Sequence, residues 1–189
     1  MNIKKLFPTI AATFFLPSFS YCQNIEQVIF DSKDSTAGHY LAIQPPSKNI
    51  KGVVVLLTSF LPPESLLPET KLHNTASAND ILTIVASARQ KLYADSGAIA
   101  RITAILKDVA TRFSADPAKF ALAGFDEAGN IALRYTELTY ENPSAYLVQP
   151  KAVFGIETPV DLFGLWHWAE RQIKKNYWPG TKRKAATSR

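Results

Sequence analysis

The chain has 189 residues, of which 47% are hydrophobic and 20% are charged, so it is about one domain long and can bury a core. This composition excludes an intrinsically disordered chain, and no apolar run reaches the roughly 18 residues that a membrane-spanning helix needs. The formal net charge of +5 arises at the two ends, because residues 23–170 hold 12 Lys and Arg against 16 Asp and Glu. The predicted domain is therefore mildly acidic.

Residues 1–22 have the pattern of a secretory signal peptide. Lys4 and Lys5 form a basic start, residues 6–19 are mostly apolar, and small side chains stand one and three positions before Gln23. Two prolines in the apolar stretch argue against a first core helix, and the tyrosine before the cysteine argues against a lipoprotein. We expect an exported protein, periplasmic or extracellular in a bacterium. Cleavage before Gln23 would also remove the only cysteine, which excludes thiolate and disulfide chemistry from the mature chain.

Short strands and one helix are expected in the first half of the domain. Residues 25–30 and 39–43 are predicted to form an antiparallel pair of strands, separated by a polar, turn-rich loop. The continuously apolar run 52–57 is typical of a strand that is buried on both faces, which implies a parallel sheet covered by helices. A loop with three prolines then precedes a helix over about 69–78 and a second buried strand over 81–87.

The second half of the domain alternates helices and strands. Asp95 or Ser96 is expected to cap a long amphipathic helix. Its apolar residues recur at helical spacing and are Ile99, Ile102, Leu106, Val109 and Phe113. The later elements expected are a strand over 119–123, a helix over 128–139, a strand over 151–157 and a helix over 160–177 capped by Thr158.

This order of elements predicts an α/β fold with a mostly parallel sheet of about six strands and helices on both faces. One domain is expected over residues 23–178. Residues 179–189 form a basic tail that we expect to be disordered and solvated. The tail superficially resembles a nuclear-import signal, but the sequence holds no helix-turn-helix, RNA-binding or zinc-finger spacing, so no nucleic-acid partner is expected.

The third buried strand ends in a turn that marks a candidate site, because ligand sites of such sheets form at the carboxyl ends of the strands. The turn reads GFDEAG at 124–129 and is followed at once by the helix. This layout of strand, tight turn and helix projects one residue, here Asp126, above the sheet. Strand and helix pack closely in such a turn, which requires small side chains, and Gly124, Ala128 and Gly129 meet that requirement.

These residues resemble the nucleophile elbow of α/β-hydrolases, in particular secreted bacterial esterases with a GFSxGGNIALRYAE-type motif. The resemblance covers about residues 25–177, and its most specific part is the elbow with the "NIALRYTEL" that follows it. It implies an incomplete α/β-hydrolase sandwich and a small ester or acyl ligand. The sequence holds no P-loop, GxGxxG or His/Asp metal spacing, so no cofactor and no metal are expected. The resemblance also implies an oxyanion hole formed by the backbone N–H of Glu127 and one from Ser59 or Phe60.

The serine position of this motif holds Asp126, which leaves two interpretations. In the first, Asp126 is a carboxylate nucleophile, as in haloalkane dehalogenases and epoxide hydrolases, which form a covalent alkyl ester and need a histidine to activate water. In the second, Asp126 has replaced the serine in a chain that no longer catalyses, and the helix N-terminus accommodates its charge. The neighbouring Glu127 favours the second interpretation, because another negative charge weakens an oxyanion site.

The histidines of the sequence do not match the position of the family's catalytic base, which lies with the acid on later strands that this chain is expected to lack. His39 and His73 fall on early elements. His167 lies between two tryptophans, and this stretch is expected to pack against the sheet or its rim. We therefore predict a truncated esterase-related protein with weak activity or none. The alternative is a secreted, non-catalytic domain that binds a small ester, an acyl ligand or a partner chain in the same cleft.

Overall fold

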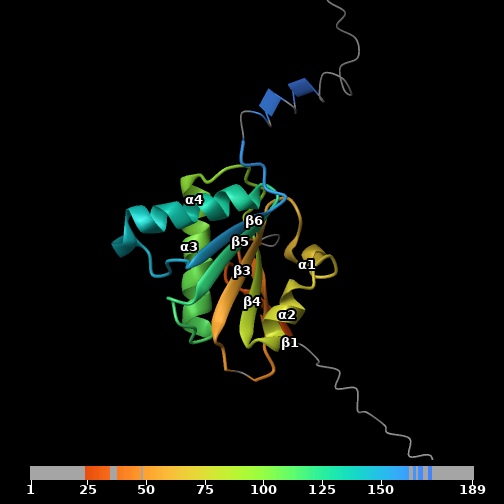
Figure 1. Cartoon of the computed structure of the whole chain (residues 1–189), viewed down its shortest axis with the longest axis vertical. Coiled ribbons are helices and arrows are strands. Elements are labelled where there is room, and N and C mark those ends of the chain that lie inside the picture. The colour runs from red at the N-terminus through yellow and green to blue at the C-terminus, as the bar shows by residue number, and fades with distance from the viewer. Residues whose placement is uncertain are drawn as a thin grey trace, which may run out of the picture.

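A six-stranded sheet forms the centre of the computed structural model, which describes residues 24–34, 38–47, 49–161, 164, 166–167 and 170–171 (Figure 1). The strands are β1 (Asn24–Ile29), β2 (His39–Gln44), β3 (Gly52–Thr58), β4 (Ile81–Ser87), β5 (Phe120–Phe125) and β6 (Ala152–Ile156). The helices are α1 (Pro63–Leu66), α2 (Leu72–Ala78), α3 (Ser96–Arg112) and α4 (Ala128–Glu141), and η1 (Pro143–Ala145) is a short 3-10 turn.

The strand order is β1-β2-β4-β3-β5-β6. β1 pairs antiparallel with β2, and β2 pairs antiparallel with β4, whereas β4, β3, β5 and β6 are mutually parallel. The sheet is therefore mixed but mostly parallel, and the predicted α/β class with about six strands is confirmed. The register aligns Leu57 of β3 with Gly124 of β5 and Thr58 with Ser87 of β4, so the carboxyl ends of these strands lie in one row.

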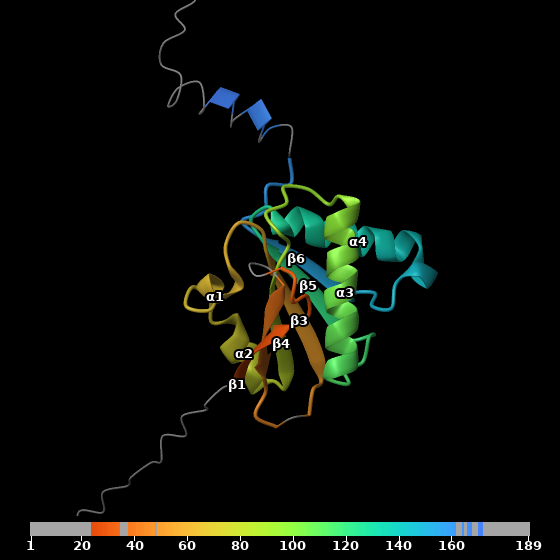
Figure 2. The same cartoon turned by 180° about the vertical axis from the view of Figure 1, so that it is seen from behind.

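Helices cover the two faces of the sheet unequally. The side chains of α3 and α4 pack with one face in a single large apolar cluster. The view from behind shows both helices on one side of the sheet (Figure 2). The short helices α1 and α2 lie on the other face, where their main contacts are with β2 and β4 (Figure 1). Phe125, Phe154 and Ile156 on that second face are only partly buried. The region of β5 and β6 is thus open on one side among the described residues.

The helix α3 shows how closely the local pattern determines the structure. Its N-cap is Asp95, whose Oδ1 accepts a hydrogen bond from the backbone N–H of Ala98 at 2.7 Å. The predicted stripe is buried at Ile102, Leu106 and Val109, which bury their side chains against the sheet. Capping satisfies one of the free N–H groups of the first turn, and the apolar stripe provides the tertiary stabilisation that a helix in water lacks.

The structure differs from the sequence predictions in the loop after β3 and after β6. The proline-rich loop contains the unpredicted helix α1, which begins at Pro63, a residue type well suited to a first helical turn. The predicted cap Thr158 does not form, because its Oγ1 is buried without a hydrogen-bond partner, and Asp161 instead accepts from the N–H of Gly164 at 2.9 Å. Trp166 is 70% exposed, so the expectation that it packs against the sheet is wrong.

Several predictions concern residues outside the described ranges, namely the signal peptide over 1–22, the basic tail over 179–189 and most of the helix over 160–177. The described residues 164, 166–167 and 170–171 of that last segment are helical. No helix within the described part of the chain is both long enough and apolar enough to cross a membrane.

A buried tyrosine anchors β2 to α3. Tyr40 is 0% exposed, and its hydroxyl donates to Oδ2 of Asp108 at 2.6 Å. The same carboxylate accepts from Nε of Arg112 at 3.0 Å. Burial alone raises the pKa of Asp108, but the hydrogen bonds from Arg112 and Tyr40 together outweigh that effect and lower it. The lowered pKa means that this cluster stabilises the fold above the ordinary Asp range and that the contribution is lost as the pH falls through the folded-state pKa.

We therefore expect Tyr40→Phe to lower the free energy of unfolding by about 1–2 kcal/mol at pH 7, since a buried hydrogen bond to a charged group is lost. The penalty should shrink once the pH is well below about 4, where Asp108 becomes protonated. Urea unfolding at neutral and acid pH measures both effects. Tyr93→Phe, at a tyrosine that is 62% exposed, is the matched control and should leave stability unchanged. An equal penalty at both pH values would contradict the role given to Asp108.

Candidate functional site

Asp126 occupies the turn between β5 and α4 with a left-handed backbone, at φ 53°. Its N–H donates to the carbonyl oxygen of Ile156 at the end of β6 at 2.9 Å, and its own carbonyl oxygen accepts from the N–H of Gly129 at 3.0 Å. The side chain is exposed at the carboxyl edge of the sheet. A left-handed conformation is costly for most side chains but is tolerated by aspartate, which is one physical reason why this residue type fits the turn.

The turn has no room for side chains at its glycines. A Cβ added at Gly124 would lie 2.3 Å from the backbone carbonyl of Ala128, which cannot move without displacing α4. A Cβ added at Gly129 would lie 1.8 Å from Oγ1 of Thr158, and one added at Gly155 would lie 2.4 Å from the same atom. Positions 124 and 129 thus require small residues for two different reasons. Gly124 packs against α4, and Gly129 is approached by Thr158.

Negative charge dominates the turn. The pKa of Glu127 is raised, first by partial burial and then by the adjacent charge of Asp126, while a hydrogen bond from the backbone N–H of Glu127 itself opposes the rise. That N–H is the donor that the resemblance assigns to an oxyanion hole. A developing oxyanion at this position would lie beside two carboxylates, which is electrostatically unfavourable.

A cavity of about 750 Å³ lies beside the ends of β3 and β4. Its lining residues come from three loops and are Lys33, Asp34, Ser59, Phe60, Leu61, Pro62, Ser87, Arg89 and Gln90. Ser59 is buried and its hydroxyl donates to the carbonyl oxygen of Lys91 at 2.6 Å, whereas Phe60 is 50% exposed. The structure thus brings the two predicted oxyanion-loop residues together with the end of β4. Asp126 and Glu127 are not among the lining residues, although β3 and β5 are adjacent strands.

A charged network at the rim of this cavity was not found from the sequence. Nε of Arg89 donates to Oδ2 of Asp34 at 2.6 Å, and Nη2 of Arg89 donates to Oδ2 of Asp31 at 3.1 Å. Arg101 is buried behind them, with Nε donating to the carbonyl oxygen of Ser87 at 2.8 Å, and burial lowers its pKa. The network fixes the loop between β1 and β2. The sequence feature that could have indicated this network is Arg101, an arginine on the otherwise apolar face of the helix that Asp95 caps.

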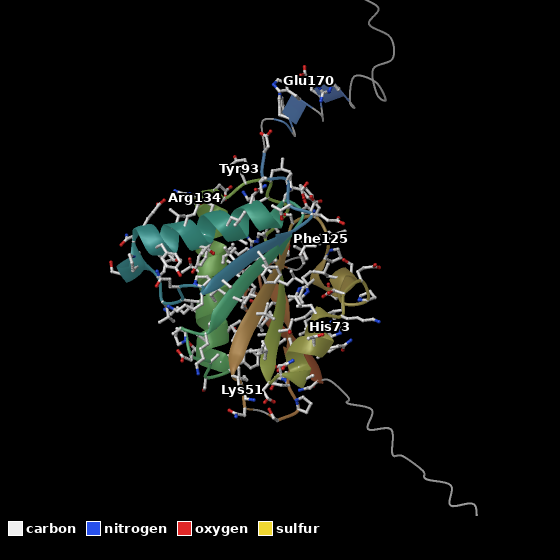
Figure 3. All side chains as sticks on the ribbon, in the orientation of Figure 1. Lys51, His73, Tyr93, Phe125, Arg134 and Glu170 are labelled. Atoms are coloured by element: carbon white, nitrogen blue, oxygen red, sulfur yellow. The ribbon has the colours of Figure 1, made fainter. Side chains whose placement is uncertain are left out.

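The described histidines lie away from the elbow. Nε2 of His39 and Oε1 of Glu64 are 2.6 Å apart, which ties β2 to α1. Three strand spacings, about 14 Å, separate β2 from β5 in the sheet. His73 lies on α2, well apart from Phe125 at the end of β5 (Figure 3). His167 is exposed in the segment after β6. Within the described ranges, no group of three or more His, Cys, Asp or Glu residues could hold a metal ion.

Comparison with known proteins supports the fold alone. No protein-family model and no curated protein matches the sequence. Among solved structures, fluorophosphonate-binding serine hydrolase F of Staphylococcus aureus, with substrate bound, matches with a TM-score of 0.58 at 12% identity, covering 76% of this chain and 59% of that chain. Esterase 2 of Thermogutta terrifontis, phosphonylated by sarin, matches with a TM-score of 0.51 at 14% identity, covering 71% of this chain and 54% of that chain.

A fungal esterase from Rhizomucor miehei also matches, with a TM-score of 0.52 at 12% identity, covering 72% of this chain and 44% of that chain. The chain spans less than two thirds of the length of each of these three proteins. The structure is therefore a partial α/β-hydrolase-like fold, and it is structurally related to esterases and serine hydrolases at low identity. The predicted fold class agrees with this similarity.

The packing of the elbow gives a direct test. We expect Gly124→Ala to lower the free energy of unfolding by about 3 kcal/mol, because the added methyl group meets the backbone of α4. Thermal or urea unfolding measures this change. Gly97→Ala in the first turn of α3 is the matched control, since its Cβ would approach only Oδ1 of Asp95 at 3.4 Å, and it should leave stability within about 1 kcal/mol of the original. Equal effects at both glycines would contradict the close packing of strand and helix.

Proposed function

We propose that the chain is an α/β-hydrolase-like protein related to carboxylic ester hydrolases, whose elbow no longer supports serine ester hydrolysis. The observation that carries the proposal is the placement of Asp126, exposed and left-handed, in the strand–turn–helix position. The relationship of the fold to esterases supports it as well. The strand–turn–helix of an elbow is present, while its projecting residue is an aspartate.

Aspartate cannot replace serine in ester hydrolysis without a change of chemistry. Attack of a carboxylate on an ester carbonyl gives a tetrahedral adduct, and loss of the alkoxide from it would give a mixed anhydride. The carboxylate is the better leaving group of the two. The tetrahedral adduct therefore collapses back to the ester. A productive carboxylate nucleophile requires displacement at a saturated carbon, followed by hydrolysis of the enzyme ester by a water that a histidine activates. His39 is paired with Glu64 and His73 lies on α2, so neither is placed to activate that water.

A second function is supported by the cavity beside Ser59 and Phe60. Its volume of about 750 Å³ is within the range of small-molecule pockets, and it has both apolar and polar walls. We propose a small ester or acyl compound as its ligand if the chain binds without turnover. Saturable binding of a short-chain acyl ester, lost on Phe60→Ala while the protein stays folded, would favour this alternative over residual catalysis.

Export is part of the proposal, because Lys4, Lys5 and the apolar run over 6–19 are typical of a signal peptide. We expect protein recovered from the periplasm or medium of a bacterial host to begin at Gln23. N-terminal sequencing of that material measures the cleavage site. Recovery of the intact N-terminus from the cytoplasm alone would contradict export.

The elbow is tested by p-nitrophenyl ester hydrolysis. We expect Asp126→Ser to remain within about tenfold of the uncatalysed background, because a serine hydroxyl needs a base within hydrogen-bond reach. Adding a C-terminal segment that carries an acid and a histidine to Asp126→Ser should raise the rate by several orders of magnitude. Asp116→Ser, at an exposed aspartate away from the elbow, is the matched control.

Two outcomes would contradict the proposed loss of activity. One is efficient ester turnover by the original chain that disappears in Asp126→Ala, which would make Asp126 a nucleophile. The other is efficient turnover by Asp126→Ser that disappears when His167→Ala is added, which would make His167 a base. Circular dichroism of each variant ensures that a lost rate reflects chemistry and not unfolding.

A further inference from the structure

The outer edge of β6 is unprotected among the described residues. β6 pairs with β5 alone, in a continuous register without a bulge. Its sequence, Ala-Val-Phe-Gly-Ile, contains neither a charge nor a proline. The strand at the opposite edge of the sheet, β1, carries Glu26, an exposed charge of the kind that discourages pairing with another chain. The two edges of the sheet are thus protected differently.

The chain leaves β6 in a direction that keeps this edge free. Glu157 adopts a left-handed φ of 55°, and Thr158 then lies against Gly129 and Gly155. The carbonyl oxygen of Pro159 accepts from Nδ2 of Asn130 at 2.8 Å. The segment after the strand is therefore held over the start of α4 and does not run along the edge of β6.

Hydrogen-bond alternation places free backbone groups on the open edge. The carbonyl oxygen of Ile156 accepts from the N–H of Asp126 at 2.9 Å. Because alternate residues of a strand face the same neighbour, Ala152 and Phe154 also bond to β5, and Val153 and Gly155 present their N–H and C=O groups outward. This pattern suits an added antiparallel strand centred on Phe154.

The segment KAVFGIE at 151–157 is complementary to itself in charge. In an antiparallel pair centred on Phe154, Lys151 of one chain comes opposite Glu157 of the other, and this pair occurs twice. Lys151 and Glu157 are both exposed. The two Phe154 side chains, which are only partly buried, would meet at the centre and extend the apolar cluster that Phe125 and Ile156 border. Opposite charges and aromatic side chains directly across from each other stabilise strand pairs.

We propose that β6 is an interaction surface for a second copy of this chain, which pairs with it antiparallel across a two-fold axis at Phe154. The paired edges join two six-stranded sheets into one. The charge pattern selects a second copy of this chain as the binding partner. Another copy places opposite charges across from both Lys151 and Glu157, whereas an unrelated strand would not in general do so. The pairing hides the free backbone groups of both edges at once.

The experiment measures the dissociation constant of the full chain by sedimentation equilibrium from micromolar to submillimolar concentration. We expect a dimer that Lys151→Glu and Glu157→Lys each weaken by about tenfold, since either change places like charges opposite each other twice. Mixing the two single variants should give a heterodimer tighter than either variant alone, because opposite charges are then restored. Added salt should reduce these differences.

Two further variants make the assignment specific. Val153→Pro removes an outward N–H without touching a bond to β5, and we expect it to yield a folded monomer. Lys107→Glu, an exposed charge reversal on α3, is the matched control and should leave the dissociation constant unchanged. A chain that is monomeric throughout the series, or a dimer that is indifferent to the charges at 151 and 157, would overturn the proposal.

Discussion

The close approach of α4 to the end of β5 is the constraint on which the candidate site depends. With Gly124 against the backbone of Ala128, the chain must reverse within a single residue, and that residue is driven to a positive φ. Asp126 is therefore exposed by the packing of strand and helix, whatever chemistry its side chain performs. The register of β3, β4 and β5 then places the loops that carry Ser59 and Ser87 at the same edge.

The turn and the aspartate within it have separate physical origins. The glycines and the hydrogen bond from Asp126 to Ile156 serve packing, whatever chemistry the turn performs. An aspartate suits the left-handed position and the N-terminus of α4, so the fold itself accommodates this residue type. The charge of Asp126 also acts on its neighbour, because it contributes to the raised pKa of Glu127.

Elements with strong local patterns could be predicted from the sequence, while contacts between loops could not. The buried strands, the stripe of α3 and the GFDEAG turn follow from periodicity and turn chemistry, and they appear where they were expected. The ion pairs of Arg89 with Asp31 and Asp34 join residues far apart in sequence, which no local pattern encodes. The cap at Thr158 fails for the same reason, because its side chain lies against Gly129, which is distant in sequence, as well as against the nearby Gly155.

Thr158 also links the elbow to the open edge of the sheet. It occupies the space above Gly129 of α4 and Gly155 of β6, and the carbonyl oxygen of Ile156 between them holds the N–H of Asp126. The left-handed turn at Glu157 that makes these contacts possible is the same turn that lifts the chain off the edge of β6. The proposed pairing would thus add a strand to the element that fixes the backbone of Asp126. The edge and the elbow share β6, one hydrogen bond from Asp126 to Ile156, and one partly buried threonine.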